Sequence, residues 1–448
     1  MSSKMSRRNF VKMGSLAVAG TSLRLQDKAD STTTVADQPG IRKFRKLGRT
    51  EFEASDISMG AGPLREPDVA RYAYDLGINY FDTAEGYGNG RSESALGKAL
   101  KFMDREKVFI TTKLHIDDED TAETILDRFN KCQNRLDTPY VDALYMHSVK
   151  SLPLLDHEGF HAAVNTLKAE GRLKHMGISS HGPRGEDGDS MEKVLCAAAE
   201  DGRFDLMLLV YNFMNKETGE KILAACKKNN VGTTAMKTRP GVIKVEQFDP
   251  ENLTEEQDKY VQGRVERGST RQKAIDRYQR WIDRQKEDQA KTIPYLEKFG
   301  VKTDEELAKV SVQWVLKNPD MHTICVGMKD FDTVERFISI SGTKLSRMDS
   351  EFIRQFEYAY SNQYCRHGCT LCSAHCPQGL PVSTIMRYAY YFKCQGREKY
   401  AIQKYTQLHE SSNAAVCETC DAPCLTVCPH GLDVQAHLTN AHSMLTLG

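Results

Sequence analysis

The sequence lacks an excess of charge of either sign, and it lacks a long apolar run. Its 448 residues include 61 Lys and Arg and 61 Asp and Glu, so the formal net charge is zero. Nucleic-acid-binding proteins normally carry a basic excess, so we expect no nucleic-acid partner. A transmembrane helix needs a run of about 18 or more apolar residues, and the chain contains no such run. We therefore expect no transmembrane segment.

The composition is that of a globular protein. Hydrophobic residues make up 40% of the chain and charged residues 27%, which suits a protein with a sizeable core. At roughly 150 residues per domain, this length corresponds to about two to three domains.

Cysteine is scarce before residue 330 and dense after it. The 13 cysteines comprise four in the first part of the chain and nine between Cys365 and Cys428. Nine cysteines in one short segment indicate either disulfide bonds or a metal site. The four early ones are irregularly spaced, and we expect them to be small buried apolar residues: Cys132, Cys196, Cys226 and Cys325.

Residues 1–40 resemble an export signal followed by a flexible tether. Ser6-Arg7-Arg8-Asn9-Phe10-Val11-Lys12 precedes a short apolar stretch and is similar to a twin-arginine signal. That route carries folded proteins, which would suit a protein that loads a metal cluster before export. The resemblance implies a periplasmic or otherwise exported location. The alternative is a basic start with a chance arginine pair, in a cytoplasmic protein.

From residue 41 onward, short apolar runs alternate with amphipathic stretches. Ile41–Ser58 indicates a hairpin that leads into a strand, and helical periodicity marks Glu93–Phe102, Thr121–Asn134 and Glu158–Ala169. Eight strands with helices between them predict the α/β class and a (β/α)8 TIM barrel over residues 41–345. The strand candidates are Ile57–Gly62, Ile78–Asp82, Val108–Lys113, Val141–His147, His175–Ser180, Leu206–Val210, Val231–Lys237 and Thr323–Met328.

A doubly wound open sheet is the alternative fold. Such a sheet usually opens with Gly-x-Gly-x-x-Gly after its first strand. Here the turn reads Gly60-Ala61-Gly62-Pro63-Leu64-Arg65, which lacks the third glycine. The turn therefore favours the barrel.

A highly charged insertion, from Lys244 to Pro294, follows the seventh predicted strand. Its mixed charges predict solvated helices that are held partly by i,i+4 pairs. The alternative is a lid or a partner-docking arm, because loops after barrel strands lie over the active face.

Four polar residues lie at the carboxyl ends of three successive predicted strands. Asp82 ends the second strand and Tyr87 follows in its loop, while Lys113 ends the third and His147 the fourth. In a barrel these ends share one face, so all four side chains can converge.

This set of residues suits reduction of a carbonyl, which needs a hydride on carbon and a proton on oxygen. Tyr87 would supply the proton, and a nearby Lys113 ammonium would lower the pKa of the phenol. Asp82 would hold Lys113 in place, and His147 would orient the carbonyl oxygen. In the reverse direction Tyr87 would act as the base in alcohol oxidation.

The segment around these residues resembles the aldo-keto reductase family. Residues 78–88 read INYFDTAEGYG, and Lys113 in Thr111-Thr112-Lys113 and His147 in Leu144-Tyr145-Met146-His147 fall where that family has its other catalytic residues. The resemblance covers residues 41 to about 340. It implies a (β/α)8 barrel that binds NADP(H), or less often NAD(H), over the strand ends, with a small carbonyl or alcohol compound as substrate.

The nicotinamide contacts match the family less well. Leu208 stands where the family often has Gln, and Met236 where it often has a stacking aromatic residue. The positions that the resemblance assigns to the cofactor are Ser179, Ser180, Asn212, Lys237, Gly327 and Lys329. The predicted catalytic residues are therefore all present, whereas some of the nicotinamide-contact positions differ from those of the family.

The C-terminal cysteines form an internal repeat. The first group is Cys365-x3-Cys369-x2-Cys372-x3-Cys376-Pro377, and the second is Cys417-x2-Cys420-x3-Cys424-x3-Cys428-Pro429. A shift of 52 residues superimposes three cysteines and the trailing Cys-Pro segment of the two groups. Each copy thus carries four thiols and a proline.

Cysteine runs that end in Cys-Pro resemble bacterial-type ferredoxins, in which the fourth cysteine of each run serves the other cluster. The resemblance implies one [4Fe–4S] cluster on Cys365, Cys369, Cys372 and Cys428, and a second on Cys417, Cys420, Cys424 and Cys376. Zinc sites and disulfides are the alternatives. Cys394 lies outside the repeat and is expected to be structural. Helical patterns at Ser383–Phe392 and Lys399–Leu408 favour an α-helical ferredoxin-like iron–sulfur domain over residues 346–448.

Two functions follow from these patterns. The first is an aldo-keto reductase-type oxidoreductase with two clusters for electron transfer and a redox partner protein as a candidate partner. The second is an iron–sulfur electron-transfer or binding protein whose barrel no longer binds nicotinamide. Leu208 and Met236 favour the second, and the intact Asp82, Tyr87, Lys113 and His147 favour the first.

Overall fold

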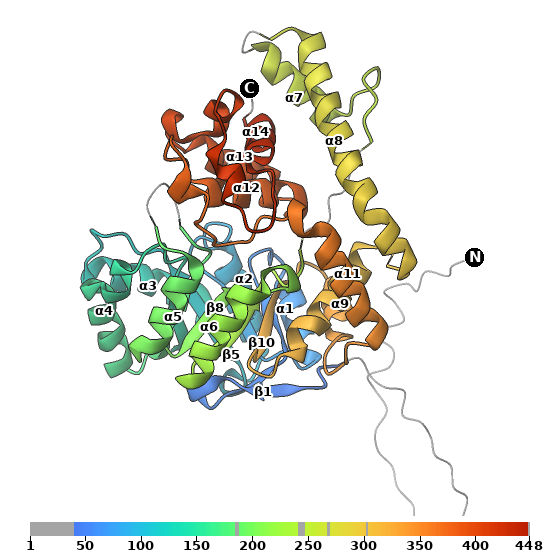
Figure 1. Ribbon diagram of the computed structural model, residues 1–448. Coiled ribbons are helices and arrows are strands. Elements are labelled where there is room, and N and C mark those ends of the chain that lie inside the picture. Colours follow the sequence, from blue (N-terminus) through green and yellow to red (C-terminus); the bar gives the residue numbers. More distant parts are fainter. Residues whose placement is uncertain (1–39, 184–187, 241–246, 267–268, 302, 447–448) are drawn as a thin grey trace, which may run out of the picture. The chain divides into compact units, whose positions relative to one another are not determined.

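The computed structural model describes residues 40–446 apart from 184–187, 241–246, 267–268 and 302 (Figure 1). The twin-arginine pattern and the tether that follows it lie outside the described residues. The described residues belong to one compact unit.

Eight parallel strands form a closed barrel, as the sequence predicts. The last strand pairs with the first, with Ile324 opposite Ile57, so the alternative of an open doubly wound sheet is wrong. Each predicted strand overlaps an observed one within a few residues. The strands are β3 (Ile57–Gly60), β4 (Tyr80–Asp82), β5 (Phe109–Leu114), β6 (Val141–Met146), β7 (Leu173–Ser179), β8 (Leu206–Val210), β9 (Gly232–Met236) and β10 (Thr323–Gly327).

Most strand residues are buried, which is why the strands are largely apolar. All five residues of β8, Leu206–Val210, are buried. Inward-facing side chains such as Tyr80, Tyr145 and Leu208 fill the barrel interior, and outward-facing ones such as Met207 and Leu209 pack against the helices.

Amphipathic helices surround the barrel (Figure 1). The helix α3 illustrates why they form, since Thr121 and Thr124 make a capping box and Ile125, Phe129 and Leu136 bury one face. The surrounding helices are α1 (Pro67–Asp75), α2 (Arg91–Leu100), α3 (Ala122–Leu136), α4 (Glu158–Ala169), α5 (Met191–Asp201), α6 (Lys216–Lys228), α9 (Asp304–Lys317) and α10 (Phe331–Ile338).

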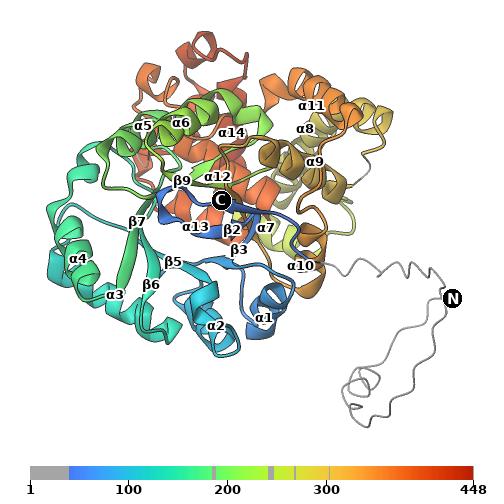
Figure 2. The same ribbon diagram turned by 90° about the horizontal axis from the view of Figure 1, so that it is seen from below.

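The predicted hairpin closes the amino-terminal end of the barrel. Strands β1 (Phe44–Lys46) and β2 (Glu53–Ser55) pair antiparallel, and Figure 2 views this end of the molecule. Leu47 is fully buried among the inward-facing side chains of the strands. This end is therefore plugged, and only the opposite end of the barrel is available for a site.

The charged insertion is helical, as its charge pattern predicts. It forms α7 (Glu255–Glu266) and the long α8 (Arg271–Lys298), which share a small core with Val261 and Ala274. The helix α8 continues through Pro294 to Lys298, so the predicted end of the insertion at Pro294 is not a helix boundary.

The C-terminal segment is helical, which confirms its two predicted helices. Its helices are α11 (Arg347–Tyr360), α12 (Val382–Gln395), α13 (Glu398–Thr406) and α14 (Val434–Leu445). Among the described residues after β10, no strand is present. Residues 380–445 contribute a hydrophobic core of their own, in which Ile385, Ala401 and Leu438 are buried.

The C-terminal segment contacts the loops that follow the barrel strands. The Met191 N–H donates to the Gly368 carbonyl at 3.1 Å, and the Thr384 hydroxyl donates to the Pro183 carbonyl at 3.0 Å. Because these loops lie at the carboxyl ends of the strands, the C-terminal segment lies at the same end of the barrel as the predicted site.

None of the helices in the part of the chain that the structure describes is both long and apolar enough to cross a bilayer.

Candidate active site at the carboxyl end of the barrel

The four predicted catalytic residues meet at one end of the barrel. Asp82 is the last residue of β4 and Lys113 lies near the end of β5. His147 directly follows β6, and its N–H donates to the Leu114 carbonyl at 2.8 Å. Tyr87 lies in the turn between β4 and α2. Parallel pairing of neighbouring strands brings these ends together, as the sequence predicts.

Lys113 and Asp82 form a buried ion pair. The Lys113 ammonium donates to Asp82 Oδ1 at 2.5 Å and to the Thr83 carbonyl at 2.6 Å, and the two side chains are 0% and 2% exposed. The Thr111 hydroxyl donates to Asp82 Oδ2 at 2.8 Å, so both carboxylate oxygens are bonded. Burial opposes the charge on Lys113, but Asp82 and Tyr87 outweigh it and raise the lysine pKa.

Tyr87 lies against this pair. The Lys113 ammonium is 5.2 Å from the centre of the Tyr87 ring. The turn is fixed by backbone bonds from Tyr87 N–H to the Ala84 carbonyl and from Ser92 N–H to the Tyr87 carbonyl. Gly88, with φ of +61°, supplies the left-handed conformation that the turn needs.

The net direction of the Tyr87 pKa differs from the sequence-based expectation. Lys113 does act to lower it, but burial of the phenol is the larger effect and raises the pKa to about 12. Tyr87 is therefore a protonated phenol at neutral pH, which suits it to donate a proton.

His147 faces Tyr87 and is held by a second histidine. The two rings meet edge to face, with centroids 6.0 Å apart. The His115 ring stacks on the His147 ring at 4.1 Å, and His115 Nδ1 lies 3.0 Å from the His147 carbonyl oxygen. Sequence reasoning missed His115, although it follows Lys113 by two residues at the end of the same strand.

Two of the residues assigned to the nicotinamide already bond within the chain. Ser179 Oγ accepts from the Ser148 N–H at 2.9 Å, and the Ser180 hydroxyl donates to the Val149 carbonyl at 2.8 Å. Both serines are fully buried.

Asn212, a third such residue, is fully buried and bonded at both ends of its amide. Its Oδ1 accepts from the Met214 N–H at 3.0 Å, and its Nδ2 donates to the Lys237 carbonyl at 2.9 Å and to the Tyr364 hydroxyl at 3.4 Å. Tyr364 belongs to the C-terminal segment. Ser179, Ser180 and Asn212 are therefore each engaged in hydrogen bonds within the chain in this arrangement.

The remaining three assigned residues are spread apart. Gly327 and Lys329 are exposed at the end of β10, where the Lys329 ammonium lies 3.9 Å from the Asp330 carboxylate. Lys237, after β9, lies instead against the C-terminal segment, where its Nζ donates to the Tyr391 hydroxyl at 3.3 Å.

The eight cysteines of the repeat fall into two groups. Burial raises the pKa of Cys365, and the neighbouring charges of Cys369, Cys372 and Cys428 raise it further. A narrow cavity of about 10 Å³ is lined by the other four, Cys376, Cys417, Cys420 and Cys424. The last cysteine of each run therefore lies with the other run, as the ferredoxin resemblance implies.

No disulfide joins cysteines in the described part of the chain. Within that part, no three His, Cys, Asp or Glu side chains stand close enough together to hold a single metal ion.

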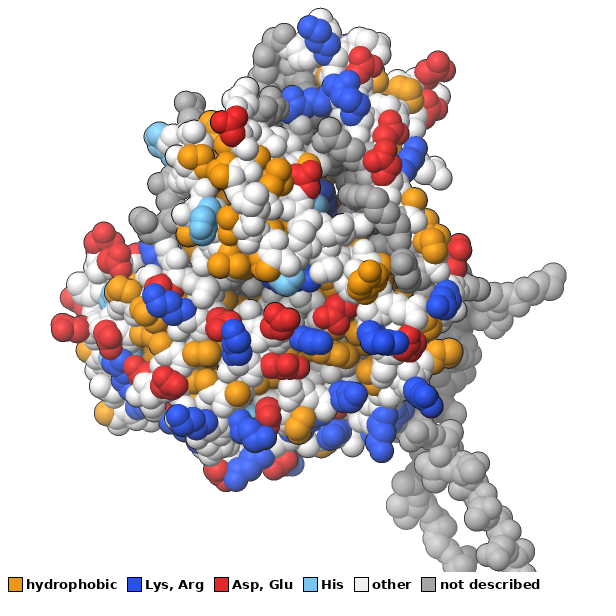
Figure 3. All heavy atoms as spheres, in the orientation of Figure 1, with side chains coloured by type: hydrophobic (Ala, Val, Ile, Leu, Met, Phe, Trp, Pro, Cys, Tyr) orange, Lys and Arg blue, Asp and Glu red, His pale blue; other side chains and the backbone are white. Residues whose placement is uncertain are grey.

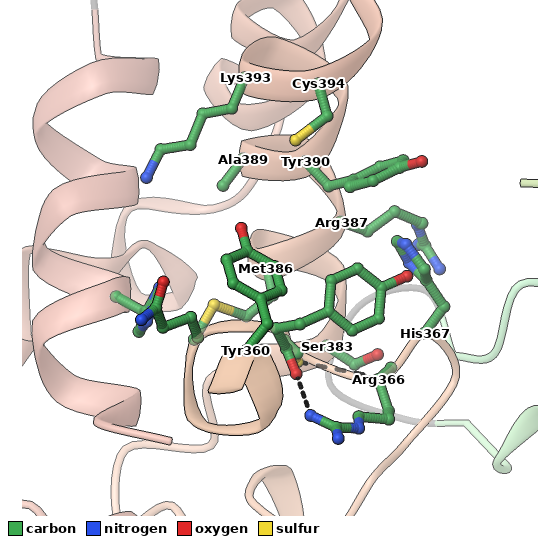
Figure 4. Close-up of a pocket in the computed structure, with 14 residues that line it drawn as sticks. Tyr360, Arg366, His367, Ser383, Met386, Arg387, Ala389, Tyr390, Lys393 and Cys394 are labelled. Carbon is green, nitrogen blue, oxygen red and sulfur yellow. Dashed lines mark hydrogen bonds between the residues drawn. The ribbon is translucent and has the colours of Figure 1, made fainter. Parts of the chain in front are cut away.

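A second cavity, of about 70 Å³, lies inside the C-terminal segment (Figure 4). Cys394, Tyr390 and Lys393 of α12 line it together with Cys365. In Figure 4, Arg387 and His367 lie together on the side away from Lys393. Cys394, expected to be structural, thus faces a cavity.

A profile of the aldo/keto reductase family matches residues 65–357. The chain is 35% identical to "Probable aldo-keto reductase 1" of Glycine max over 158 residues, which is 31% of this chain and 45% of that protein. It is 34% identical to "L-galactose dehydrogenase" of Arabidopsis thaliana over 154 residues, 31% of this chain and 48% of that protein. The chain thus spans less than half the length of these two relatives.

Other relatives align over more of their length. The chain is 24% identical to "NADH-specific methylglyoxal reductase" of Escherichia coli strain K12 over 352 residues, covering 70% of this chain and 98% of that protein. A solved aldo-keto reductase from Klebsiella pneumoniae in complex with NADPH has 17% identity and a TM-score of 0.48, over 71% of this chain and 96% of that one. The family match at residues 65–357 takes in more than half of the chain and includes Asp82, Tyr87, Lys113 and His147, so the chain belongs to the aldo/keto reductase family.

Proposed function

We propose that the protein is an oxidoreductase that interconverts a carbonyl compound and an alcohol. The buried Lys113–Asp82 pair beneath the Tyr87 ring is the observation that carries this proposal. A lysine ammonium that is kept charged in a buried site stabilises a phenolate, which is what Tyr87 becomes after it gives up its proton.

In the reducing direction, the Tyr87 hydroxyl gives its proton to the substrate oxygen as that oxygen gains negative charge. Lys113, held by Asp82, then balances the charge of the phenolate. His147, edge-on to Tyr87, orients the carbonyl oxygen. NADP(H) or NAD(H) is the candidate source of the hydride, as the names and titles of several similar proteins suggest.

Replacing Tyr87 by Phe tests this role. The variant lacks only the hydroxyl, so we expect carbonyl reduction to fall by about 100-fold or more, the usual contribution of a positioned acid, while thermal unfolding stays unchanged. Tyr74→Phe, on the outer helix α1, is the matched control and should keep full activity. Wild-type rates in the Tyr87 variant would overturn the assignment.

A second candidate function is an electron-transfer or binding protein whose barrel does not hold nicotinamide. It is supported by the internal hydrogen bonds of Ser179, Ser180 and Asn212. Titration of the purified protein with NADPH and with NADH, followed by fluorescence and by calorimetry, separates the two functions. Binding of either nucleotide supports the reductase, and binding of neither supports the second function.

We propose further that the C-terminal segment holds two [4Fe–4S] clusters. The support is the grouping of the cysteines into Cys365, Cys369, Cys372 and Cys428, and into Cys376, Cys417, Cys420 and Cys424. A cubane cluster binds one thiolate at each of four iron atoms, so its ligands stand farther apart than those of one ion. Each group supplies the four thiols that one such cluster needs.

The crossed arrangement gives a sharp test. Protein purified without oxygen should contain about eight iron and eight sulfide per chain. Cys376→Ser should damage the cluster that the second run mainly holds, and Cys428→Ser the one held by the first, as read by electron paramagnetic resonance. Cys394→Ser is the control and should keep both clusters. Zinc in place of iron would overturn the proposal. If Cys376→Ser instead damaged the cluster held by the first run, and Cys428→Ser the one held by the second, the crossed pairing would be wrong.

A nicotinamide gives up two electrons as hydride, whereas a cluster passes one electron at a time. We therefore propose that the clusters exchange electrons with a redox partner protein. Reduction of the clusters by dithionite but not by NADPH would agree with electron exchange through a partner protein. Direct and rapid reduction of the clusters by NADPH would contradict it.

A further inference from the structure

Three cationic side chains gather between the end of β9 and the C-terminal segment. We call Lys237, Arg387 and Arg397 the cationic cluster. Lys237 comes from the barrel, Arg387 lies on α12, and Arg397 precedes α13. Two separate parts of the fold therefore bring these charges together.

Lys237 is held by a histidine and a tyrosine. Its Nζ lies 2.7 Å from His181 Nδ1 and donates to the Tyr391 hydroxyl at 3.3 Å. An ammonium has three N–H groups. The third has no acceptor among the described residues, so Lys237 retains one donor for a ligand.

Arg397 and Lys237 both lie close to the aromatic ring of Tyr391. The Lys237 ammonium is 5.1 Å and the Arg397 guanidinium 5.3 Å from the centre of that ring. Arg397 also stacks on Tyr400 at 4.1 Å. Tyr391 therefore contacts both cations.

Arg387 adds a buried charge behind these two. It is 4% exposed and donates to the carbonyls of His181 and Pro183 at 3.0 and 3.2 Å. Carbonyl oxygens fix its position without neutralising it.

None of the three cations forms an ion pair with a carboxylate in the described part of the chain. Over the face shown in Figure 3, by contrast, Lys and Arg lie intermingled with Asp and Glu on the barrel. Arg387 is buried, Lys237 is half-buried and Arg397 is exposed, and like charges brought together without a counter-charge repel one another. The arrangement also lowers the Lys237 pKa, through burial and through Arg387 and Arg397. An anion placed here would relieve that repulsion.

The cluster lies at the same end of the barrel as the predicted catalytic residues. Lys237 follows a barrel strand at the same end as Asp82 and Lys113, and the charge of Arg397 reaches Tyr87, where it favours the phenolate. A group bound at the cluster can therefore belong to a molecule whose carbonyl meets Tyr87.

We propose that the cationic cluster binds an anionic group of the substrate, so that this oxidoreductase acts on small carbonyl compounds carrying a carboxylate or a phosphate. This inference rests on the proposed function. Arg387, Arg397 and Tyr391 all come from the C-terminal segment, so that segment would select the substrate.

Binding of unreactive anions tests the cluster without any turnover. Succinate, acetate and inorganic phosphate are titrated into the wild-type protein by calorimetry, with succinamide as the neutral counterpart of succinate. We expect at least one anion to bind, succinamide to bind about tenfold more weakly than succinate, and Arg397→Gln and Lys237→Met to weaken the anion about tenfold or more. Lys399→Gln removes an exposed charge from α13 and should change nothing. Equal binding by Arg397→Gln and Lys399→Gln, or no anion binding, would overturn the proposal.

Turnover separates this inference from the proposed function. Succinate semialdehyde should be reduced with a higher kcat/KM than butanal, and Arg397→Gln should lower that ratio toward one. Equal reduction of both compounds by the wild-type protein would overturn the anion site and leave the reductase intact. Anion binding without reduction of either compound would retain the site and overturn the reductase. If Arg397→Gln weakens NADPH and leaves the anions unaffected, the cluster serves the cofactor's phosphates and the substrate assignment is wrong.

Discussion

The Lys113–Asp82 pair shows how a charged residue can be buried completely in a barrel. Lys113 is fully enclosed, yet Asp82 and the Thr83 carbonyl accept from its ammonium, and Asp82 in turn accepts from Thr111. Removing one partner from such a pair leaves a buried charge without compensation, which is far more harmful than removing both. The same pair therefore serves stability as well as the proton transfer that we propose.

Lys113→Met should destabilise the protein by about 3–5 kcal/mol, because the Asp82 carboxylate loses its counter-charge in a buried site. The double variant Asp82→Asn/Lys113→Met should recover much of that loss, although neither protein should reduce carbonyls. Urea unfolding measures both free energies. If the double variant lost as much free energy of unfolding as the Asp82→Asn and Lys113→Met single variants lose together, the two side chains would not be acting as a pair.

At the scale of elements, the contact between the β7 loop and the first cysteine run is unusually close. Gly182 has a φ of +87°, and a Cβ added to it would lie 2.4 Å from the Cα of Gly368. Only glycine fits there, because both the conformation and the space exclude a side chain. Arg387 bonds to the two residues on either side of Gly182, so this contact also positions the cationic cluster.

Gly182→Ala should therefore lower the melting temperature and weaken anion binding at the cationic cluster. Gly171→Ala is the matched control, because Gly171 has a φ of +70° but no neighbouring atom within 4 Å of the added Cβ. The control should lose about 1 kcal/mol, the usual penalty of a left-handed alanine, and the Gly182 variant clearly more. Equal thermal unfolding of the two variants would show that the contact is not tight in solution.

At the scale of the whole molecule, the chain joins a barrel with one closed end to a cysteine-rich segment at its other end. We propose that this assembly is completed in the cytoplasm and then exported, because the segment containing Arg7 and Arg8 resembles a signal for the export of folded proteins.

Replacing Arg7 and Arg8 by lysines should leave the protein in the cytoplasm, because the export machinery reads that arginine pair as an address. Cell fractionation with immunoblotting measures the distribution, and an Arg42→Lys variant, outside the signal, should be exported as before. Unchanged periplasmic recovery of the double lysine variant would point to another route or to no signal.

The sequence by itself determined the barrel and the convergence of the predicted catalytic residues, because both follow from local patterns along the chain. Apolar runs at regular intervals predict strands, and the carboxyl ends of neighbouring parallel strands must meet, so the order of the strands alone predicts that Asp82, Lys113 and His147 converge. The two cysteine runs could also be recognised from the sequence, since their spacing repeats along the chain.

Only the tertiary structure decided what surrounds those residues. No local pattern shows that Tyr364 bonds to Asn212 or that Arg397 and Lys237 share one tyrosine ring, because these partners lie far apart in the chain. The direction of the Tyr87 pKa was also beyond the sequence, since the balance between burial and the Lys113 charge depends on how completely the folded chain removes water from the phenol.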